Sequence, residues 1–228
     1  IRDAAHIWGK ETGETEEAIR KELGDKLIRV ALIGSGGEKL VRYACVIVDR
    51  KDAAGRSGMG AVMGSKNLKA VAVRGHRRLN VTDSDKLRQL TKWLVDNIND
   101  VIGWAHNYGT GSGLDSGVTS GNLPTRNFRD GDFSNPDALD AKTIKNTIGI
   151  GMDGCYACPV RCKKIVRIGK PWNVDPVYGG PEYEALASLG SNCGIDNLNA
   201  VTKANELCNR HSLDAISTGV VIAFAMEC

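Results

Sequence analysis

The sequence predicts an α+β fold, with a strand-rich part over residues 1–79 followed by a mostly α-helical part over residues 80–228. Three observations lead to this prediction. Short β-branched runs separated by turns recur before residue 80. Apolar residues at spacings of three and four dominate after it. The chain has 228 residues, 42% of them hydrophobic and 25% charged, which is typical of globular proteins with one large domain or two small ones.

The first part is predicted to hold one helix and three strands. Thr15 is a candidate N-cap followed by two glutamates, and Gly24 is a candidate C-terminal stop, so we expect a short helix between them. The runs 27–33, 43–48 and 69–73 are largely apolar and β-branched. Each is predicted to form a strand.

The second part is predicted to be built from helices. The clearest pattern starts at Thr82 and repeats apolar residues at helical spacing as far as Val101. Residues 182–189 and 200–210 predict two more helices. Residues 103–137 are rich in Gly, Ser, Asn, Asp and Pro and predict a long loop. Loops beyond about 12 to 15 residues are usually functional or disordered, so one of these two is expected there.

Charge and hydropathy exclude several classes of partner. Thirty Lys and Arg stand against 27 Asp and Glu, giving a net charge of +3, and the charges are interspersed. We therefore expect neither a nucleic-acid nor a membrane partner. There is no run of about 18 apolar residues and no signal-peptide pattern, so we expect neither secretion nor membrane insertion. The chain starts without Met and stops just after an apolar run, which suggests an internal piece of a longer protein.

The strongest chemical signal is a C-x2-C-x3-C array formed by Cys155, Cys158 and Cys162, within residues 155–162, which we call the cysteine loop. Close spacing lets three thiolates face one inorganic cluster, so a [4Fe-4S] cluster is the first interpretation. Zinc and a redox-inert trio are the alternatives. A fourth thiolate is expected either from outside this chain or from the remaining cysteines, which are Cys45, Cys193, Cys208 and Cys228. Of these, Cys45 lies in an apolar strand and is expected to be core.

Residues 53–66, which we call the glycine-rich loop, form the second signal. They contain four glycines within ten residues, together with Arg56 and Lys66. Bare backbone and flanking cations suit the binding of a phosphate, although a purely structural turn is the alternative. The loop matches neither the nucleotide P-loop nor the dinucleotide fingerprint. The glycines at 34–37 are expected to form an ordinary turn.

The third signal is a pair of carboxylates, Glu182 and Glu184, at the predicted start of a helix behind Pro181. Acidic residues stabilise helix N-termini, so a well-made helix start explains them without any chemistry. The functional alternative is a carboxylate that transfers a proton at a substrate.

Taken together, these motifs resemble the aldehyde:ferredoxin oxidoreductase family. The resemblance rests on residues 52–70, residues 122–128, the cysteine loop and residues 180–184, in this order. It runs over essentially all 228 residues and corresponds to an internal piece of much longer family chains.

The resemblance implies a bis-pterin tungsten cofactor, or its molybdenum counterpart, beside a [4Fe-4S] cluster. It implies cluster ligands at Cys155, Cys158 and Cys162, with the fourth ligand far downstream. Pterin and phosphate contacts are implied for the five residues that match the family's glycine-rich loop and the end of its second pterin motif, with Asp52 as a further candidate. These residues are Ala53, Gly55, Arg56, Leu213 and Asp214, and the candidate Asp52.

This sequence departs from the family pattern at two positions of the second pterin motif, D-x-x-G-L-[DC]. Asn209 replaces the first Asp and Ser212 replaces the Gly. The family's metal-bridging E-x-x-H falls at residues 203–206, where Lys203 and Glu206 stand at its two ends, so we do not expect that metal site.

The implied reaction converts an aldehyde and water to a carboxylic acid, with Glu184 or Glu182 handling the proton and ferredoxin accepting the electrons. The implied assembly is a homo-oligomer or a subunit of an electron-transfer complex, and the implied location is the cytoplasm. Two alternatives remain open. One is a family member acting on another substrate, such as an aromatic thioester reductase subunit. The other is a zinc- or cluster-stabilised module without catalysis.

Overall fold

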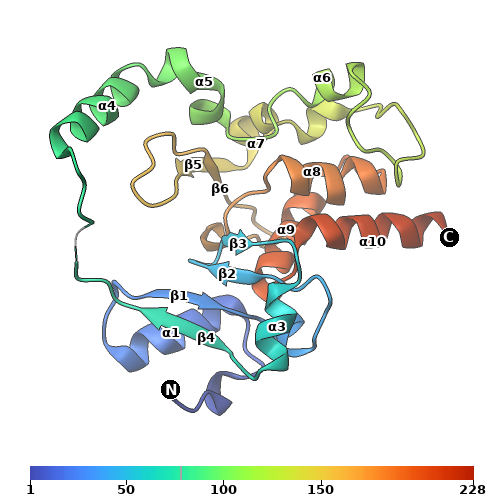
Figure 1. Cartoon of the computed structure of the whole chain (residues 1–228). Coiled ribbons are helices and arrows are strands. Elements are labelled where there is room, and N and C mark those ends of the chain that lie inside the picture. Colours follow the sequence, from blue (N-terminus) through green and yellow to red (C-terminus); the bar gives the residue numbers. More distant parts are fainter. Residues whose placement is uncertain (78) are drawn as a thin grey trace.

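The computed structural model describes residues 1–77 and 79–228 and confirms the α+β fold (Figure 1). In these residues the α-helices are α1 (Thr12–Leu23), α2 (Ser35–Glu38), α3 (Met59–Ser65), α4 (Ser84–Asp96), α5 (Ile98–Tyr108), α6 (Leu114–Thr119), α7 (Ala141–Thr147), α8 (Tyr183–Leu189), α9 (Leu198–His211) and α10 (Ala215–Glu227). The strands are β1 (Arg29–Leu32), β2 (Val46–Val48), β3 (Asp52–Ala54), β4 (Ala70–Val73), β5 (Gly149–Asp153) and β6 (Lys163–Val166). Short 3₁₀ turns lie at Ala5–Ile7, Pro136–Leu139, Pro176–Tyr178 and Ser191–Cys193.

The first part of the chain forms an antiparallel sheet in the order β3-β2-β1-β4. In its register, Ala31 pairs with Val48 on one side and with Val71 on the other. The three predicted strands are confirmed as β1, β2 and β4, each shorter than its apolar run. Strand β3 was not predicted, because it has only three residues and none of them is β-branched. Buried apolar residues beneath the sheet form the first core, namely Ile7, Ile19, Ile28, Val30, Leu32, Cys45 and Ile47.

Helix α1 begins earlier than predicted. Its N-cap is Glu11, whose side chain forms a reciprocal capping box with Glu14, so Thr15 is not the cap. Thr15 instead lies inside the helix and is buried. The predicted stop is confirmed, because Gly24 takes up the left-handed conformation at φ +66° directly after Leu23.

Close backbone packing joins α2 to α3 and fixes the glycine-rich loop on the sheet. A Cβ on Gly64 would lie 1.9 Å from the Gly37 oxygen, and one on Gly60 would lie 2.4 Å from the Cys45 oxygen. Larger residues would push the helices apart. The glycines at 34–37, predicted to be an ordinary turn, therefore form a one-turn helix with a packing role.

The helical part differs from prediction at its start. The pattern from Thr82 to Val101 is divided into α4 and α5, because Asn97 leaves the helical conformation and its side-chain amide donates to the Trp93 oxygen at 2.8 Å. None of the α4 side chains is buried. The predicted loop over residues 103–137 also contains the end of α5 and all of α6.

Helices α8 and α9 confirm the two remaining helix predictions, and α8 packs against α10 at the centre of the second core (Figure 1). Strands β5 and β6, which were not predicted, form a hairpin whose tip is the cysteine loop.

Main-chain contacts tie the two parts of the chain together. The Asp214 nitrogen donates to the Tyr43 oxygen at 3.1 Å, and the Cys45 nitrogen donates to the Ser212 oxygen at 2.8 Å. Residues 212–214, which follow α9, are therefore bound to residues 43–45, which precede β2. No helix in residues 1–77 and 79–228 is both long enough and apolar enough to span a membrane.

Candidate functional site

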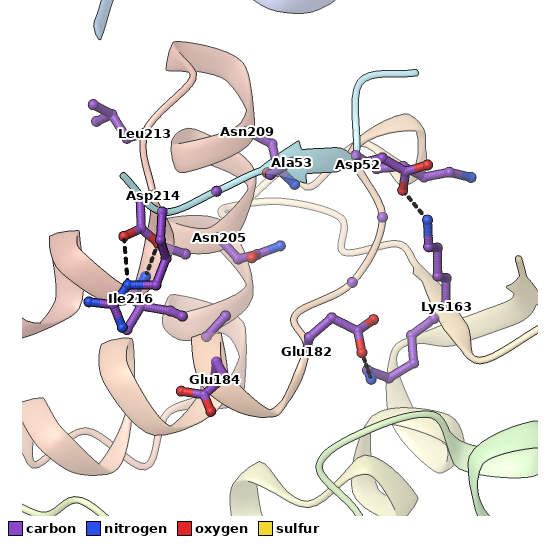
Figure 2. A pocket seen from close by; sticks show the side chains of 18 of the residues that line it. Asp52, Ala53, Lys163, Glu182, Glu184, Asn205, Asn209, Leu213, Asp214 and Ile216 are labelled. Atoms are coloured by element: carbon purple, nitrogen blue, oxygen red, sulfur yellow. Dashed lines mark hydrogen bonds and ion pairs between the residues drawn. The ribbon is translucent and has the colours of Figure 1, made fainter. Parts of the chain in front are cut away.

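A cavity of about 650 Å³ lies where four segments of the chain meet (Figure 2). Its walls come from residues 51–56, 155–164, 179–185 and 205–216. Every site residue that the sequence predicts lines this cavity, with the exception of Cys158. The lining residues include Asp52, Ala53, Gly55, Arg56, Cys155, Cys162, Glu182, Glu184, Leu213 and Asp214. The volume is that of a site for a cofactor or a small molecule. The chemical roles of these residues stay predictions.

The glycine-rich loop contributes its first residues to the cavity. A Cβ on Gly55 would meet nothing closer than the Ala53 Cβ and the Asp214 Oδ1, both 4.0 Å away, so the backbone is open to a ligand. The Arg56 side chain is 67% exposed, and its Nε lies 3.9 Å from Asp214 Oδ2. An open backbone beside an exposed guanidinium is suited to a phosphate.

The other glycines of this loop have a structural role. Gly60 and Gly64 allow the close packing described above, and a Cβ on Gly58 would collide with the Arg42 oxygen at 2.3 Å. The two interpretations of the glycine-rich loop therefore apply to different residues. Gly55 faces the cavity, while the later glycines hold α3 in place.

Residues 212–214 lie beside the glycine-rich loop, and Leu213 and Asp214 line the cavity there. Ser212 is fully buried and left-handed at φ +56°, a conformation that glycine adopts most easily. Its hydroxyl accepts a hydrogen bond from the Gly34 nitrogen at 2.8 Å, which compensates for the replacement of glycine at this position. Asp214 caps α10 by accepting from the Ile216 and Ser217 nitrogens at 3.1 and 3.2 Å.

Asn209, the other departure from the family motif, also lines the cavity. Its Nδ2 donates to the Tyr178 oxygen at 2.9 Å. The amide supports the chain in front of Glu182, and it brings no negative charge to the cavity.

The cysteine loop is held at several points. The Cys158 nitrogen donates to the Cys155 oxygen at 3.0 Å, which closes a turn within the loop. His106 of α5 contacts the Val160 oxygen through Nδ1 at 2.8 Å. Arg161 donates to the Met152 oxygen at 2.9 Å across the base of the hairpin. The loop is therefore held by contacts from His106 and Arg161 as well as by the turn between two of its cysteines.

Two ion pairs clamp the base of the cysteine loop to the glycine-rich side of the cavity. Lys51 pairs with Asp153 at the end of β5, and Asp52 pairs with Lys163 at the start of β6. Burial alone would lower the pKa of Lys163, but hydrogen bonds to Asp52 and Cys155 raise it above its ordinary value. The lysine therefore stays charged.

The cysteines of the loop differ from the others in exposure. All seven thiols are free; Cys155 is exposed, and Cys158 and Cys162 are half-buried. Cys45 and Cys208 are buried, and burial raises their pKa values to about 12 and about 11. Cys45 is thus confirmed as core. Buried thiols of this kind are poor ligands and poor nucleophiles.

Glu182 is anchored at the cavity wall. Its Oε2 accepts hydrogen bonds from the Thr110 hydroxyl and, at 3.4 Å, from Lys164 Nζ. Thr110 Oγ1 also accepts from the Tyr183 nitrogen at 3.0 Å, so it caps α8 from another segment. Burial lowers the pKa of Lys164, and the neighbouring Glu182 opposes this shift. The carboxylate of Glu182 is consequently fixed in one orientation.

Glu184 differs from Glu182 although it lies only two residues later. Its side chain is exposed towards the cavity, and within the described residues its carboxylate accepts no hydrogen bond from the protein. Figure 2 shows it apart from the anchored Glu182. Of the two predicted acid–base residues, Glu184 is therefore the one whose carboxylate has no hydrogen-bond partner among the described residues.

Three residues at the site were not found from the sequence. Thr110 lies in the glycine-rich stretch after α5, which composition marked only as a loop. Lys163 and Lys164 follow the last cysteine directly, and both line the cavity. Their position next to Cys162 was the available signal.

Comparison with known proteins identifies the family of this chain. Residues 1–75 match the model of the aldehyde ferredoxin oxidoreductase N-terminal domain, and residues 88–228 match the model of domains 2 and 3 of the same enzymes. The chain belongs to the aldehyde ferredoxin oxidoreductase family. It is 40% identical over its whole length to the tungsten-containing aldehyde ferredoxin oxidoreductases of Thermococcus kodakarensis and Pyrococcus furiosus. The chain is also 31% identical over its whole length to a relative with a different name, the aliphatic sulfonate oxidoreductase, WOR-like subunit, of P. furiosus.

A solved structure shares the fold of this family member. The active-site complex BamBC of benzoyl coenzyme A reductase, bound to 1,5-dienoyl-CoA, superposes on 99% of the chain with a TM-score of 0.77 and 28% identity. The chain covers 36% of that protein and 37% of the two aldehyde oxidoreductases. It therefore spans little more than a third of the length of its relatives.

The position of the family's E-x-x-H motif is filled by ion pairs. Glu206 is fully buried and pairs with Lys203 Nζ at 2.7 Å and with Arg210 at 2.7 Å. Arg210 extends the network to Glu11, which lies directly before α1. These charges join the first and second parts of the chain.

The residues present fit the cofactors that the family implies. Cys155, Cys158 and Cys162 are free thiols on one loop, and thiols are the ligand type that iron–sulfur clusters use. Open backbone at Gly55 and the exposed guanidinium of Arg56 fit a phosphorylated pterin. In residues 1–77 and 79–228, no three metal-ligating side chains converge closely enough to hold a single metal ion.

Proposed function

We propose that the complete protein oxidises aldehydes to carboxylic acids and passes the electrons to ferredoxin. The reaction takes one aldehyde and one water and releases one carboxylic acid, two electrons and two protons. A single observation carries the proposal: the cysteine loop, the open end of the glycine-rich loop and a free carboxylate all face one cavity. Family membership is its second support.

The proposed binding roles follow from the walls of the cavity. Ala53, Gly55, Arg56 and Asp214 would hold a tungsten bis-pterin, or its molybdenum counterpart, with Asp52 and Leu213 beside them. Cys155, Cys158 and Cys162 would hold three irons of a [4Fe-4S] cluster. The bound pterin metal supplies two-electron chemistry, and the cluster carries electrons one at a time. The protein supplies binding and orientation.

Glu184 is the proposed proton acceptor. Its free carboxylate can take the proton from the water that becomes part of the product. Glu182 has the role of orienting the start of α8, because its Oε2 already accepts hydrogen bonds from Thr110 and Lys164. This assignment separates two carboxylates that are equivalent in the sequence.

The cofactor proposal is tested by metal analysis of the full-length protein purified without oxygen. We expect tungsten, iron at about four atoms per chain for one cluster, and a brown absorption spectrum. Cys162→Ser should lose iron, whereas the matched variant Cys193→Ser should keep it, because Cys193 is buried away from the cavity. A colourless protein without iron or tungsten would remove the proposal.

The carboxylate assignment is tested by two matched substitutions. Glu184→Gln should lower kcat for aldehyde oxidation by about 10²- to 10⁴-fold, the usual contribution of a general base. Glu182→Gln keeps an oxygen that accepts from Thr110 and Lys164, so its effect should stay below about tenfold. The reverse order would assign the proton to Glu182.

A second candidate function is reduction of an aromatic thioester, and the match to the BamBC complex favours it. A protein of this kind should co-purify with electron-transfer subunits that contain flavin or further clusters. Isolation as a homo-oligomer that oxidises aldehydes with ferredoxin would favour the first candidate. For either function we propose a cytoplasmic location.

A further inference from the structure

Lys163 connects the two predicted cofactor regions of the cavity. It is the first residue after Cys162, and its ammonium group pairs with Asp52 Oδ1 on the glycine-rich side. Figure 2 shows this ion pair spanning the cavity wall. Both side chains line the cavity together with Cys155 and Cys162. One cation therefore lies between the strand that carries the predicted pterin residues and the loop that carries the predicted cluster ligands.

The surroundings of the Lys163 ammonium group allow its charge to act on nearby groups. The Lys163 side chain is only 21% exposed and that of Asp52 32%, so solvent screens them weakly. The neighbouring cations have other partners, since Lys51 pairs with Asp153 and Lys164 contacts Glu182. Each of these three lysines is paired with one carboxylate. Removing one member of a pair therefore changes the local charge by one unit.

A cation beside thiolate ligands favours the reduced form of an iron–sulfur cluster, because reduction adds one negative charge. The net charge and the hydrogen bonds at the ligating sulfurs are known determinants of cluster potential. A carboxylate paired with that cation moderates its effect. The arrangement at the base of the cysteine loop has both components.

We propose that Lys163 is a positioning residue that raises the reduction potential of the cluster, and that Asp52 limits this effect from the pterin side of the cavity. The inference rests on the proposed function, since it requires that the cysteine loop holds a cluster. It adds an electrostatic link between the two cofactor regions. A substitution at Asp52 would therefore shift the reduction potential of the cluster, even though Asp52 is not a cluster ligand.

The test is a redox titration of the cluster's EPR signal in the full-length, anaerobically purified protein. Lys163→Met should lower the midpoint potential, with about a tenfold fall in the ratio of reduced to oxidised cluster at a fixed potential, which is about 59 mV for one electron. Asp52→Asn should shift the potential in the opposite direction. Lys163→Arg, which keeps the charge, should stay near the wild type.

Opposite shifts distinguish electrostatics from a loosened hairpin, because both substitutions break the same ion pair. If both variants shift the potential in the same direction, or if neither shifts it, the proposal is wrong. The double variant, which restores the net charge, should lie between the single variants. Should Lys163→Met fail to bind a cluster, Asp52→Asn decides alone, and an unchanged or lowered potential overturns the proposal. Absence of any cluster from the wild type would instead refute the proposed function.

Discussion

The loop before α6 should be intolerant of a single methyl group at Gly109. This residue has φ +73° and ψ −169°, a conformation that is essentially restricted to glycine. A Cβ there would lie 2.3 Å from the Cys162 oxygen and 2.9 Å from Lys164 Nζ. Gly109→Ala should therefore displace both the backbone of Cys162 in the cysteine loop and the Lys164 ammonium group that contacts Glu182.

The expected loss of stability has two contributions. Backbone strain for alanine in this region is about 1–3 kcal/mol, and forced overpacking against the Cys162 backbone adds about 1–3 kcal/mol. The total is about 2–6 kcal/mol. Gly121 provides the matched control, since it has φ +71° and no atom lies within 4 Å of an added Cβ. Gly121→Ala should lose only about 1 kcal/mol, from strain alone.

The assay is urea unfolding of the full-length protein, monitored by tryptophan fluorescence, with iron measured on the same samples. Gly109→Ala should unfold at lower urea than Gly121→Ala and should retain less iron, because Cys162 is displaced. Equal unfolding midpoints for the two variants would refute the reasoning, since they would show that the close approach to Cys162 has no energetic consequence.

Three further predictions concern charges and thiols. Arg210→Met should destabilise the protein by about 1–3 kcal/mol, because the buried Glu206 loses its guanidinium hydrogen bonds and keeps Lys203 as its partner; an unchanged midpoint in denaturant unfolding would contradict this. Hydrogen bonding to Lys51 lowers the pKa of Asp153, so its ionised form stabilises the fold above the unfolded pKa of about 3.9 and this stabilisation disappears as the pH falls through the folded value. The stability difference between wild type and Asp153→Asn should therefore vanish at low pH, and a difference that persists there would count against the ion pair. Iodoacetamide at pH 8 should leave Cys45 unmodified in the folded apoprotein, since burial raises its pKa to about 12, while the cysteine loop reacts; mass spectrometry of peptides would reveal the opposite pattern.

The sequence was informative wherever a local pattern determines structure. The stop of α1 at Gly24 follows from left-handed backbone, and the apolar runs of β1, β2 and β4 follow from burial. The grouping of the cysteines and the exposed end of the glycine-rich loop were also visible as spacing and composition. Long-range contacts decided the rest. Strand β3 exists because it pairs with β2, and the β5–β6 hairpin exists because it pairs with itself around the cysteine loop.

The candidate site shows the same limit. Glu182 and Glu184 could not be distinguished from spacing, because their difference depends on Thr110, a residue 72 positions earlier in the chain. Lys163 could not be assigned a partner, because Asp52 lies 111 positions before it. Side chains that act through such distant partners leave no periodic signal in a single sequence.

The main-chain hydrogen bonds between residues 43–45 and 212–214 have a practical consequence for engineering this protein. A protease that cleaves the connection between β4 and α4 would leave two pieces that remain bound to each other, because these hydrogen bonds join the strand-rich part to the segment after α9. The two pieces should elute together from a sizing column. Split versions of the gene, with the break placed in that connection, should therefore reassemble when the halves are produced in the same cell.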